Sequence, residues 1–392
     1  MDKKHLLYIN LDGFGKYYFH GCEARFPNLA ELVRHSMYFE DCHSLIPSIT
    51  VPMQCCIVSG TTSKYTNNCY QFYCAETGRV VKCGRHNNAQ TVAELLSGKG
   101  YSVLSVQQFS VENHGCSDSD MQHLYLQPGG DCRNRFSILR DYYSSLRIGN
   151  TQFGKLHDMV MLYADDLDTV GHNYIDHQDS EESRVENVRK RLEVIDEELG
   201  LLFDVLRKNG LIDEIVILIT ADHGMVGYHS PSALPELIDD LQKISGVVVS
   251  TSLDQKPDIF LLPGTIECQM YFLNKAKIDE KTIYKALGQL DYVEKVMDKD
   301  ELECEGVMPE FADMLVSPVE GKAFYADEDN DPDHIFASHD SLNDKARKVF
   351  ALIFSSGENG VVVKEKFYIN NLMNIALKHA GLPLLPEKRE SA

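Results

Sequence analysis

Short, mostly apolar segments alternate with amphipathic ones along the first 235 or so residues of the chain. Uninterrupted apolar runs of this length, flanked by turn residues, are typical of strands that are buried on both faces of a sheet. The pattern therefore predicts four buried strands, at Leu6–Leu11, Tyr101–Val106, Met159–Tyr163 and Ile215–Ile219.

The longest amphipathic segment runs from about Ser180 to Asn209. Its apolar residues recur at three- and four-residue steps, which places them on one face of a helix, and Gly210 supplies a stop. Shorter helices are predicted at Asn28–His35, Val51–Ser59, Thr91–Leu96 and Phe136–Leu146. Strands separated by helices predict an α/β fold with a mostly parallel sheet and helices on both of its faces.

The pattern of apolar and polar residues changes between about Ala233 and Asp333, where the apolar runs become shorter and are mixed with acidic segments. The strands predicted in this region are Val247–Ser250, Ile259–Leu262 and Gln269–Phe272. The α/β pattern then returns with a predicted strand at Val349–Phe354 and a closing helix at Asn370–Ala380. We therefore predict a core formed by residues 1–232 and 334–392, with a smaller α+β cap, residues 233–333, inserted in it.

The composition is strongly acidic. The 392 residues include 38 Lys and Arg against 59 Asp and Glu, a formal net charge of −21. A surface of this charge repels polyanions, which argues against a nucleic-acid polymer as a partner. A small anionic substrate remains compatible with it, because bound metal ions can reverse the sign of the field inside one cleft.

Neither a membrane segment nor a disulfide framework is indicated. No run approaches the roughly 20 apolar residues that cross a bilayer, and Leu6–Leu11 is too short for the apolar region of a signal peptide. The 11 cysteines are odd in number and form no CxxC pair, which favours small buried thiols. We therefore predict a cytoplasmic protein that does not bind membranes, and the sequence carries no signal for its oligomeric state.

Acidic and histidine residues follow three of the predicted strands. Asp12 comes directly after the first strand, Asp168 and His172 follow the third, and Asp222 and His223 follow the fourth. Ligands gather beyond the carboxyl ends of parallel strands, so these side chains lie where function is expected. Their oxygen and nitrogen ligands suit zinc, iron or manganese. Each motif alone also fits an ordinary turn or helix cap, but their common placement favours a metal centre.

Spacing alone does not fix every ligand. Four further candidates crowd the Asp168-x-x-x-His172 motif, namely Asp165, Asp166, Asp176 and His177. His339, where the chain leaves the predicted cap, would be an unremarkable surface histidine if it were taken in isolation.

Thr50 precedes a predicted helix in the segment Pro47–Pro52. Pro52, early in that helix, places Thr50 at or near the N-cap, beside unpaired amide N–H groups. Such a position favours an oxyanion or a phosphate group near the hydroxyl. A plain capping role is the alternative for this residue.

In combination these residues resemble the alkaline phosphatase superfamily, and within it the branch of nucleotide pyrophosphatases and type I phosphodiesterases. The residues that carry the resemblance are Asp12, Thr50 between Pro47 and Pro52, Asp168, His172, Asp222, His223 and His339. The match covers the core at both ends but not the cap. The segments Tyr70–Lys82 and Ser338–Ser341 also resemble phosphonoacetate hydrolases.

The resemblance implies an alkaline-phosphatase-like core with two metal ions, usually zinc, and a threonine nucleophile. One ion would be held by Asp12, Asp222, His223 and Thr50, and the other by Asp168, His172 and His339. A phosphate oxygen would contact an asparagine after the nucleophile helix, either Asn67 or Asn68, of which we prefer Asn68.

The chemistry expected from such a site is hydrolysis through a phosphothreonine intermediate. Coordination to a dication makes a hydroxyl easier to ionise, and paired ions stabilise the attacking and leaving oxygens of an in-line displacement. We therefore predict a hydrolase that cleaves phosphodiester or pyrophosphate bonds of a small, nucleotide-like, anionic substrate. Alternatives are a phosphonate hydrolase or a phosphomonoesterase of the same superfamily. A phosphomutase and a non-catalytic metal-binding protein are less favoured.

Two departures from the family pattern bear on the substrate. Val51 stands where nucleotide pyrophosphatases usually place an aromatic residue, and Gln107 and Gln108 stand where phosphonoacetate hydrolases carry lysines that bind carboxylate. The remaining candidates for stacking on a base are Tyr70, Phe72 and Tyr163. The cap is expected to decide the substrate, but it contains no readable motif.

Overall fold

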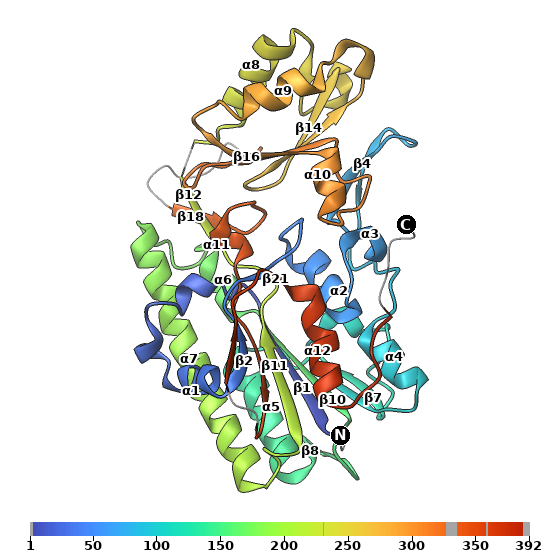
Figure 1. Cartoon of the computed structure of the whole chain (residues 1–392), viewed down its shortest axis with the longest axis vertical. Coiled ribbons are helices and arrows are strands. Elements are labelled where there is room, and N and C mark those ends of the chain that lie inside the picture. The colour runs from blue at the N-terminus through green and yellow to red at the C-terminus, as the bar shows by residue number, and fades with distance from the viewer. Residues whose placement is uncertain (1–2, 230, 327–334, 358–359, 387–392) are drawn as a thin grey trace.

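The computed structural model describes residues 3–229, 231–326, 335–357 and 360–386. Figure 1 shows a large part built around one sheet, and a smaller part, which contains α8, α9 and β14, at one end of it. The large sheet has eight strands in the order β20-β2-β19-β11-β1-β10-β6-β7. In that order the strands are Val361–Val363, Ser36–Phe39, Ala351–Ser355, Ile215–Thr220, His5–Leu11, Met159–Ala164, Val103–Val106 and His123–Leu126.

The centre of this sheet brings the carboxyl ends of three strands together. β1 lies between β10 and β11 and runs parallel to both of them. Leu11 at the end of β1 is paired with Ala164 of β10, and the preceding Asn10 is paired with Thr220 of β11. The residues that follow these strands therefore leave the sheet side by side at one edge.

The predicted α/β class with a mostly parallel sheet is confirmed, with one reversal. The strand expected at Val349–Phe354 is β19, which runs antiparallel to both β11 and β2. Hydrophobic pattern alone does not report strand direction, because both faces of β19 are covered in either case. The strands β2, β7 and β20 of this sheet were not expected from the pattern.

Helices cover both faces of the large sheet (Figure 1). The helices of one layer are α1 (Pro27–Arg34), α5 (Cys132–Ser145), α6 (Asp166–Gly171) and α7 (Glu181–Lys208), and α7 contacts the other three. The other layer contains α2 (Thr50–Ser59), α3 (Ser63–Thr66), α4 (Val92–Gly98) and α12 (Leu372–His379), in which α2 contacts the other three. The long helix expected from the apolar stripe is α7, and that stripe is turned into the core.

A second, five-stranded sheet forms the smaller part, and we call the region Leu234–Pro318 the cap. Its strands, in the order β13-β14-β15-β17-β16, are Val249–Ser250, Ile259–Pro263, Cys268–Phe272, Met314–Pro318 and Val293–Asp298. Its helices are α8 (Leu234–Ser245), α9 (Glu280–Leu287) and α10 (Lys299–Cys304). The three strands expected in this region correspond to β13, β14 and β15. The predicted boundary at residues 333 and 334 lies outside the described residues.

Two pairs of strands connect the cap to the core. β12 (Val226–His229) leads towards the cap and pairs antiparallel with β18 (Ile335–Ser338), which returns from it. The hairpin of β4 (Gln71–Cys74) and β5 (Arg79–Lys82) reaches the cap from the core side. There the backbone N–H of Tyr73 donates to the Tyr271 hydroxyl at 3.0 Å.

The described residues show neither a membrane span nor a disulfide. None of their helices is both long enough and apolar enough to cross a membrane. All 11 cysteines are free, and most of them are buried, as expected from their pattern in the sequence.

A buried arginine fastens α7 to the segment that carries one of the expected ligands. The guanidinium of Arg184 is fully buried and pairs with Glu181 through contacts of 2.7 and 2.8 Å. It also donates to the carbonyl oxygen of Gly171, the neighbour of His172, and to the Tyr18 hydroxyl, each at 3.0 Å. A buried cation that is satisfied in this way leaves several unpaired groups behind when it is removed.

We expect Arg184→Ala to lower the free energy of unfolding by about 2–3 kcal/mol, because the carbonyl oxygen of Gly171 and the Tyr18 hydroxyl lose their buried hydrogen-bond donor. Urea unfolding followed by circular dichroism measures this change. Arg34→Ala is the matched control, since the pair of Arg34 with Glu31 is exposed and screened by solvent, and its loss should leave the stability almost unchanged. Equal shifts for the two variants would contradict the role given to Arg184.

Candidate active site

Four of the expected ligands meet at the carboxyl edge of the sheet. Nε2 of His223 lies 3.3 Å from Oδ1 of Asp12 and 3.6 Å from Oδ2 of Asp222. The hydroxyl of Thr50 lies 3.0 Å from the same nitrogen. The two carboxylates and the imidazole are fully buried or nearly so. The aligned ends of β1 and β11 thus bring one ligand set to the first residue of α2.

The other three expected ligands form a second cluster beside the first. Nε2 of His172 lies 3.4 Å, and Nε2 of His339 3.8 Å, from Oδ1 of Asp168. Asp168 is on α6, with His172 one helical turn later, and His339 directly follows β18. The rings of His339 and His223 stack with centroids 3.6 Å apart, so the two clusters share one space.

All three histidines present the same ring nitrogen to this space. Their Nδ1 atoms lie 2.7 to 3.0 Å from backbone carbonyl oxygens: His172 from Ala337, His223 from Gly224, and His339 from Ser48. A carbonyl oxygen can only accept, so Nδ1 carries the proton and Nε2 keeps its lone pair. A second hydrogen bond of this kind commonly orients an imidazole that ligates a metal ion.

The carboxylates are also held in place from behind. Oδ1 of Asp222 accepts from the backbone N–H groups of Gly13 and His223 at 3.3 and 3.0 Å, and its Oδ2 accepts from Gln54 at 2.9 Å. The hydroxyl of Tyr163 donates to Oδ2 of Asp12.

Within the two clusters, Oδ1 of Asp12 and Oδ1 of Asp168 are buried and have no hydrogen-bond partner in the described part of the chain. Buried oxygens of this kind are costly unless a cation or a donor satisfies them. Together with three imidazole lone pairs, they form a donor set that fits divalent metal ions.

The first cluster carries negative charge that its own imidazole does not balance. Burial raises the pKa of Asp12 well above its usual range, and the charges of Asp222 and Asp168 raise it further. Burial also raises the pKa of Asp222. Burial lowers the pKa of His223 to about 4, so this imidazole is neutral at pH 7 and offers no counter-charge.

The second cluster is better balanced. Burial alone would raise the pKa of Asp168, but the adjacent imidazole of His172 and the other nearby histidines lower it below its usual range. Burial alone would lower the pKa of His172, but the adjacent carboxylate of Asp168 raises it above its usual range. Burial lowers the pKa of His339 to about 4. Divalent cations would stabilise the ionised carboxylates of both clusters.

Thr50 is the first residue of α2 and not its N-cap, which is Ile49. The first backbone bond of the helix runs from the N–H of Met53 to the carbonyl oxygen of Ile49. The N–H groups of Thr50 and Val51 consequently have no partner within the helix, and Pro52 has none to satisfy. An anion beside the Thr50 hydroxyl would therefore meet free amides.

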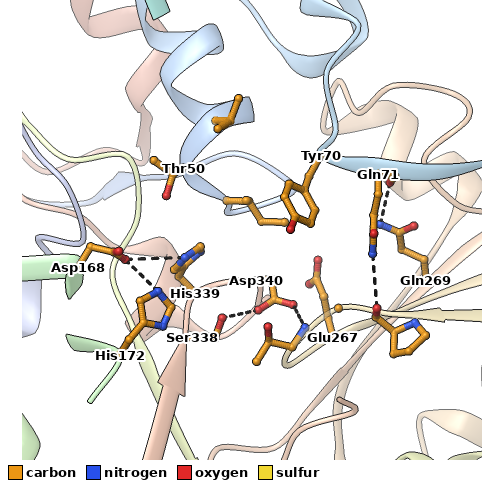
Figure 2. A pocket seen from close by; sticks show the side chains of 15 residues that line it. Thr50, Tyr70, Gln71, Asp168, His172, Glu267, Gln269, Ser338, His339 and Asp340 are labelled. Carbon is orange, nitrogen blue, oxygen red and sulfur yellow. Dashed lines mark hydrogen bonds and ion pairs between the residues drawn. The ribbon is translucent and has the colours of Figure 1, made fainter. Parts of the chain in front are cut away.

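The second cluster and Thr50 beside the first open into a cleft of about 470 Å³ between the core and the cap, shown in Figure 2. The core contributes Thr50, Asp168, His172 and His339, together with the neighbouring Ile49, Val51, Ser338 and Asp340. The hairpin and the cap contribute Tyr70, Gln71, the turn Pro263–Thr265, Glu267 and Gln269. Glu267 and Gln269 were not singled out from the sequence, because neither lies in a motif or after a predicted core strand. Asp340 lies in the segment Ser338–Ser341, but no role was predicted for it.

Asn68, the expected substrate contact, is not among the residues that line the cleft. Its fully buried side chain donates to the carbonyl oxygens of Gly84 and His86 at 3.0 and 2.7 Å, and accepts from the N–H of Tyr70 at 3.1 Å. The alternative, Asn67, is exposed and ends α3 in the left-handed region, with φ of 56°. The structure therefore gives Asn68 the role of holding the base of the hairpin.

The other acidic residues near His172 that were candidate metal ligands also have partners away from the two clusters. Asp165 pairs with Arg135 at 2.8 Å, Asp166 accepts from the N–H of Cys132 at 3.1 Å, and Asp176 accepts from Asn187 at 2.8 Å. His177 belongs to neither ligand cluster of the described chain.

Three more residues named from the sequence are explained by their contacts. Gln108 is buried and donates to Gln54 at 2.9 Å, which places it behind Asp222. The ring of Tyr163 packs edge-on against Phe109, and Phe72 packs against a small apolar cluster beneath the hairpin. Of the candidates for stacking on a base, only Tyr70 lines the cleft.

Comparison with known proteins agrees with this geometry. The profile of the family described as type I phosphodiesterase / nucleotide pyrophosphatase matches residues 6–341. Murine ectonucleotide pyrophosphatase / phosphodiesterase 5 has a similar structure, with a TM-score of 0.70 and 14% identity over 99% of this chain and 98% of that one. An inactive variant of the murine protein, in which alanine replaces a threonine, has been solved in complex with AMP, with a TM-score of 0.69.

A phosphonoacetate hydrolase from Sinorhizobium meliloti 1021, solved in complex with phosphonoformate, is also similar, with a TM-score of 0.68 and 16% identity over 96% of each chain. At these identities the structures show the fold alone. No curated protein sequence matches the chain significantly. The family profile, however, spans most of the chain and both ligand clusters. The chain therefore belongs to the type I phosphodiesterase / nucleotide pyrophosphatase family.

Proposed function

We propose that this protein hydrolyses phosphodiester or pyrophosphate bonds of small substrates, with Thr50 as the nucleophile beside two divalent metal ions. The observation that carries the proposal is the position of the Thr50 hydroxyl. It lies 3.0 Å from Nε2 of His223, at the mouth of the two ligand clusters and next to free amides of α2.

Asp12, Asp222, His223 and Thr50 would hold one ion, and Asp168, His172 and His339 the other. We propose zinc for both, because carboxylate oxygens combined with imidazole nitrogens suit it. Bound there, the ions would favour the alkoxide form of Thr50 and neutralise charge on the phosphoryl oxygens.

The reaction then has two displacements at phosphorus. Thr50 Oγ1 attacks, the bond from phosphorus to the leaving oxygen breaks, and the phosphoryl group becomes an ester of threonine. The free amides of Thr50 and Val51 can donate to its oxygens. Water then attacks the same phosphorus from the side of Asp168, His172 and His339, and Thr50 leaves with its hydroxyl restored.

Phosphonoacetate is a poor candidate substrate. Its carboxylate calls for a cationic side chain, and no lysine or arginine is among the described residues that line the cleft. Gln108, in the segment where related phosphonoacetate hydrolases carry lysines, is buried behind Asp222. This observation favours the diesterase over a phosphonate hydrolase.

Replacing the nucleophile tests the mechanism. We expect Thr50→Ala to lower kcat/KM for bis-p-nitrophenyl phosphate by at least about a thousandfold, because no covalent ester can form. Acid quenching of the wild-type protein during turnover should reveal the phosphothreonine adduct by mass spectrometry. Thr151→Ala, in a small hairpin of the core remote from the clusters, is the control and should keep full activity. Full turnover by Thr50→Ala would refute the covalent mechanism.

Metal content tests the paired clusters. After dialysis against a chelator we expect activity to be lost, and to return with about two zinc ions bound per chain. Elemental analysis with parallel assays of bis-p-nitrophenyl phosphate and p-nitrophenyl phosphate measures both quantities. An active protein with a single ion, or a preference for the monoester, would contradict the proposal.

Tyr163 offers a finer test of the first cluster. Tyr163→Phe removes the hydroxyl that donates to Oδ2 of Asp12, and we expect it to weaken zinc binding by about 10–100-fold. Competition with a chromophoric chelator measures the affinity. The control is Tyr143→Phe, because the buried Tyr143 hydroxyl has no partner and its loss should leave zinc affinity unchanged. Equal zinc affinities for the two variants would show that the Tyr163 hydroxyl does not help to position Asp12.

A further inference from the structure

The cleft contains a buried carboxylate that the proposed chemistry does not use. Glu267 precedes β15, its side chain is 4% exposed, and it lines the cleft. Its carboxylate makes no hydrogen bond or ion pair with any described residue, and burial raises its pKa well above the usual range. In Figure 2 the side chain points into the cleft from the cap. A charge that is buried and unpartnered calls for a ligand that supplies the missing donor.

The turn that presents Glu267 is built by Asp340, whose own carboxylate is fully engaged. Asp340 accepts from the N–H groups of Thr265 and Ile266 at 2.6 and 3.1 Å, and from the Ser338 hydroxyl at 2.7 Å. A side chain at Gly264 would collide with this carboxylate, which is why the turn needs glycine there. The position of Glu267 is therefore fixed before any ligand arrives.

Tyr70 supplies an aromatic face to the same cleft. Its side chain is 44% exposed, and its backbone has a φ of 73°, which a bulky residue seldom adopts. Asn68 and the N–H of Cys83, which donates to the Tyr70 carbonyl oxygen at 2.8 Å, hold this conformation. Local strain of this kind persists only where the surroundings enforce it, and it is common at ligand sites.

The hairpin and the cap form one continuous wall around these two side chains. The amide of Gln71 donates to the carbonyl oxygen of Pro263 at 3.5 Å, and that of Gln269 donates to the carbonyl oxygen of Gln71 at 3.3 Å. We call the wall formed by Tyr70, Gln71, Glu267 and Gln269 the substituent subsite. It combines a carboxylate, an aromatic face and amide groups, with no cationic side chain among its described residues.

We propose that the substituent subsite binds a primary ammonium group carried by an organic substituent of the phosphodiester. This inference rests on the proposed function, because the metal clusters would hold the phosphoryl end of the same substrate. The ammonium N–H groups would donate to both oxygens of Glu267, and its charge would face the ring of Tyr70. An ammonium group would also replace the proton as the counter-charge of the buried carboxylate.

Two esters that differ only at the distal group test the proposal with the zinc-loaded protein. They are p-nitrophenyl 2-aminoethyl phosphate and p-nitrophenyl propyl phosphate, in which a methyl group replaces the ammonium group. We expect kcat/KM at pH 7 to be at least about tenfold higher for the aminoethyl ester. Glu267→Gln should reduce this ratio to within about twofold of one.

The controls separate folding from recognition. Glu236→Gln removes an exposed cap carboxylate on α8 and should keep the wild-type ratio. Glu267→Gln should not lower the melting temperature, since Glu267 has no internal partner to lose. Tyr70→Ala should lower the ratio as well, whereas Tyr70→Phe, which retains the aromatic face, should not.

The possible outcomes distinguish the two proposals. If bis-p-nitrophenyl phosphate is hydrolysed but the aminoethyl and propyl esters are equal, the ammonium subsite is refuted and the diesterase remains. A higher kcat/KM for the p-nitrophenyl ester of phosphocholine, whose quaternary ammonium group has the charge but no N–H donor, would also refute specificity for a primary ammonium group. A preference for the p-nitrophenyl ester of thymidine 5′-phosphate that depends on Glu267 would refute it as well. If none of the diesters reacts, the proposed function itself fails.

Discussion

The accumulation of negative charge at one edge of the large sheet is the constraint on which the rest of the structure depends. The buried Asp12 and Asp222 and the half-buried Asp168 surround one space, because β1, β10 and β11 end there together. Two neutral imidazoles in the same space, His223 and His339, do little to offset this charge. The arrangement is reasonable only for a protein that recruits cations, and the surrounding hydrogen bonds hold the ligands ready for them.

Much of the molecule serves to fix the direction of these ligands. Backbone carbonyl groups from three separate segments set the tautomer of the histidines. Gln54 connects Asp222 to Gln108 and, through a bond of 2.7 Å, to Asn10 inside the sheet. Arg184 fastens the segment before His172 to the longest helix. Each of these supports is buried, so the ligand positions depend on the packing of the core and not on exposed loops.

The sequence was sufficient for the α/β class and for most of the core elements, because hydrophobic period and short apolar runs report burial directly. The seven residues that the structure brings together were also named from the sequence. Five of them follow predicted strands, His339 stands at a domain junction and Thr50 precedes a predicted helix, and the family resemblance joined them into one site. The direction of β19 was not predictable, because reversing a strand that is buried on both faces leaves its pattern unchanged. The predicted role of Asn68 came from resemblance, and its contacts with the hairpin were invisible in the sequence.

Glu267 and Asp340 show a different limit. In the sequence, Glu267 cannot be distinguished from the acidic surface residues of the cap. Its burial becomes apparent only in the fold, which brings its turn to the edge of the core. No local spacing encodes that approach, because the partners are more than 70 residues apart in the chain, as in the bonds from the turn to Asp340. The residues of the substituent subsite are therefore a product of tertiary structure.

His339 and Asp340 are adjacent in the chain, yet they serve different halves of the cleft. The imidazole of His339 belongs to the second ligand cluster, while the carboxylate of Asp340 holds the cap turn that carries Glu267. One peptide unit thus joins the second ligand cluster to the cap wall of the cleft. The side chains of the turn can be exchanged without altering a residue of that cluster, whereas the turn itself stays anchored beside it. The fold thereby separates the groups that face the cleft from the groups that set the position of its wall.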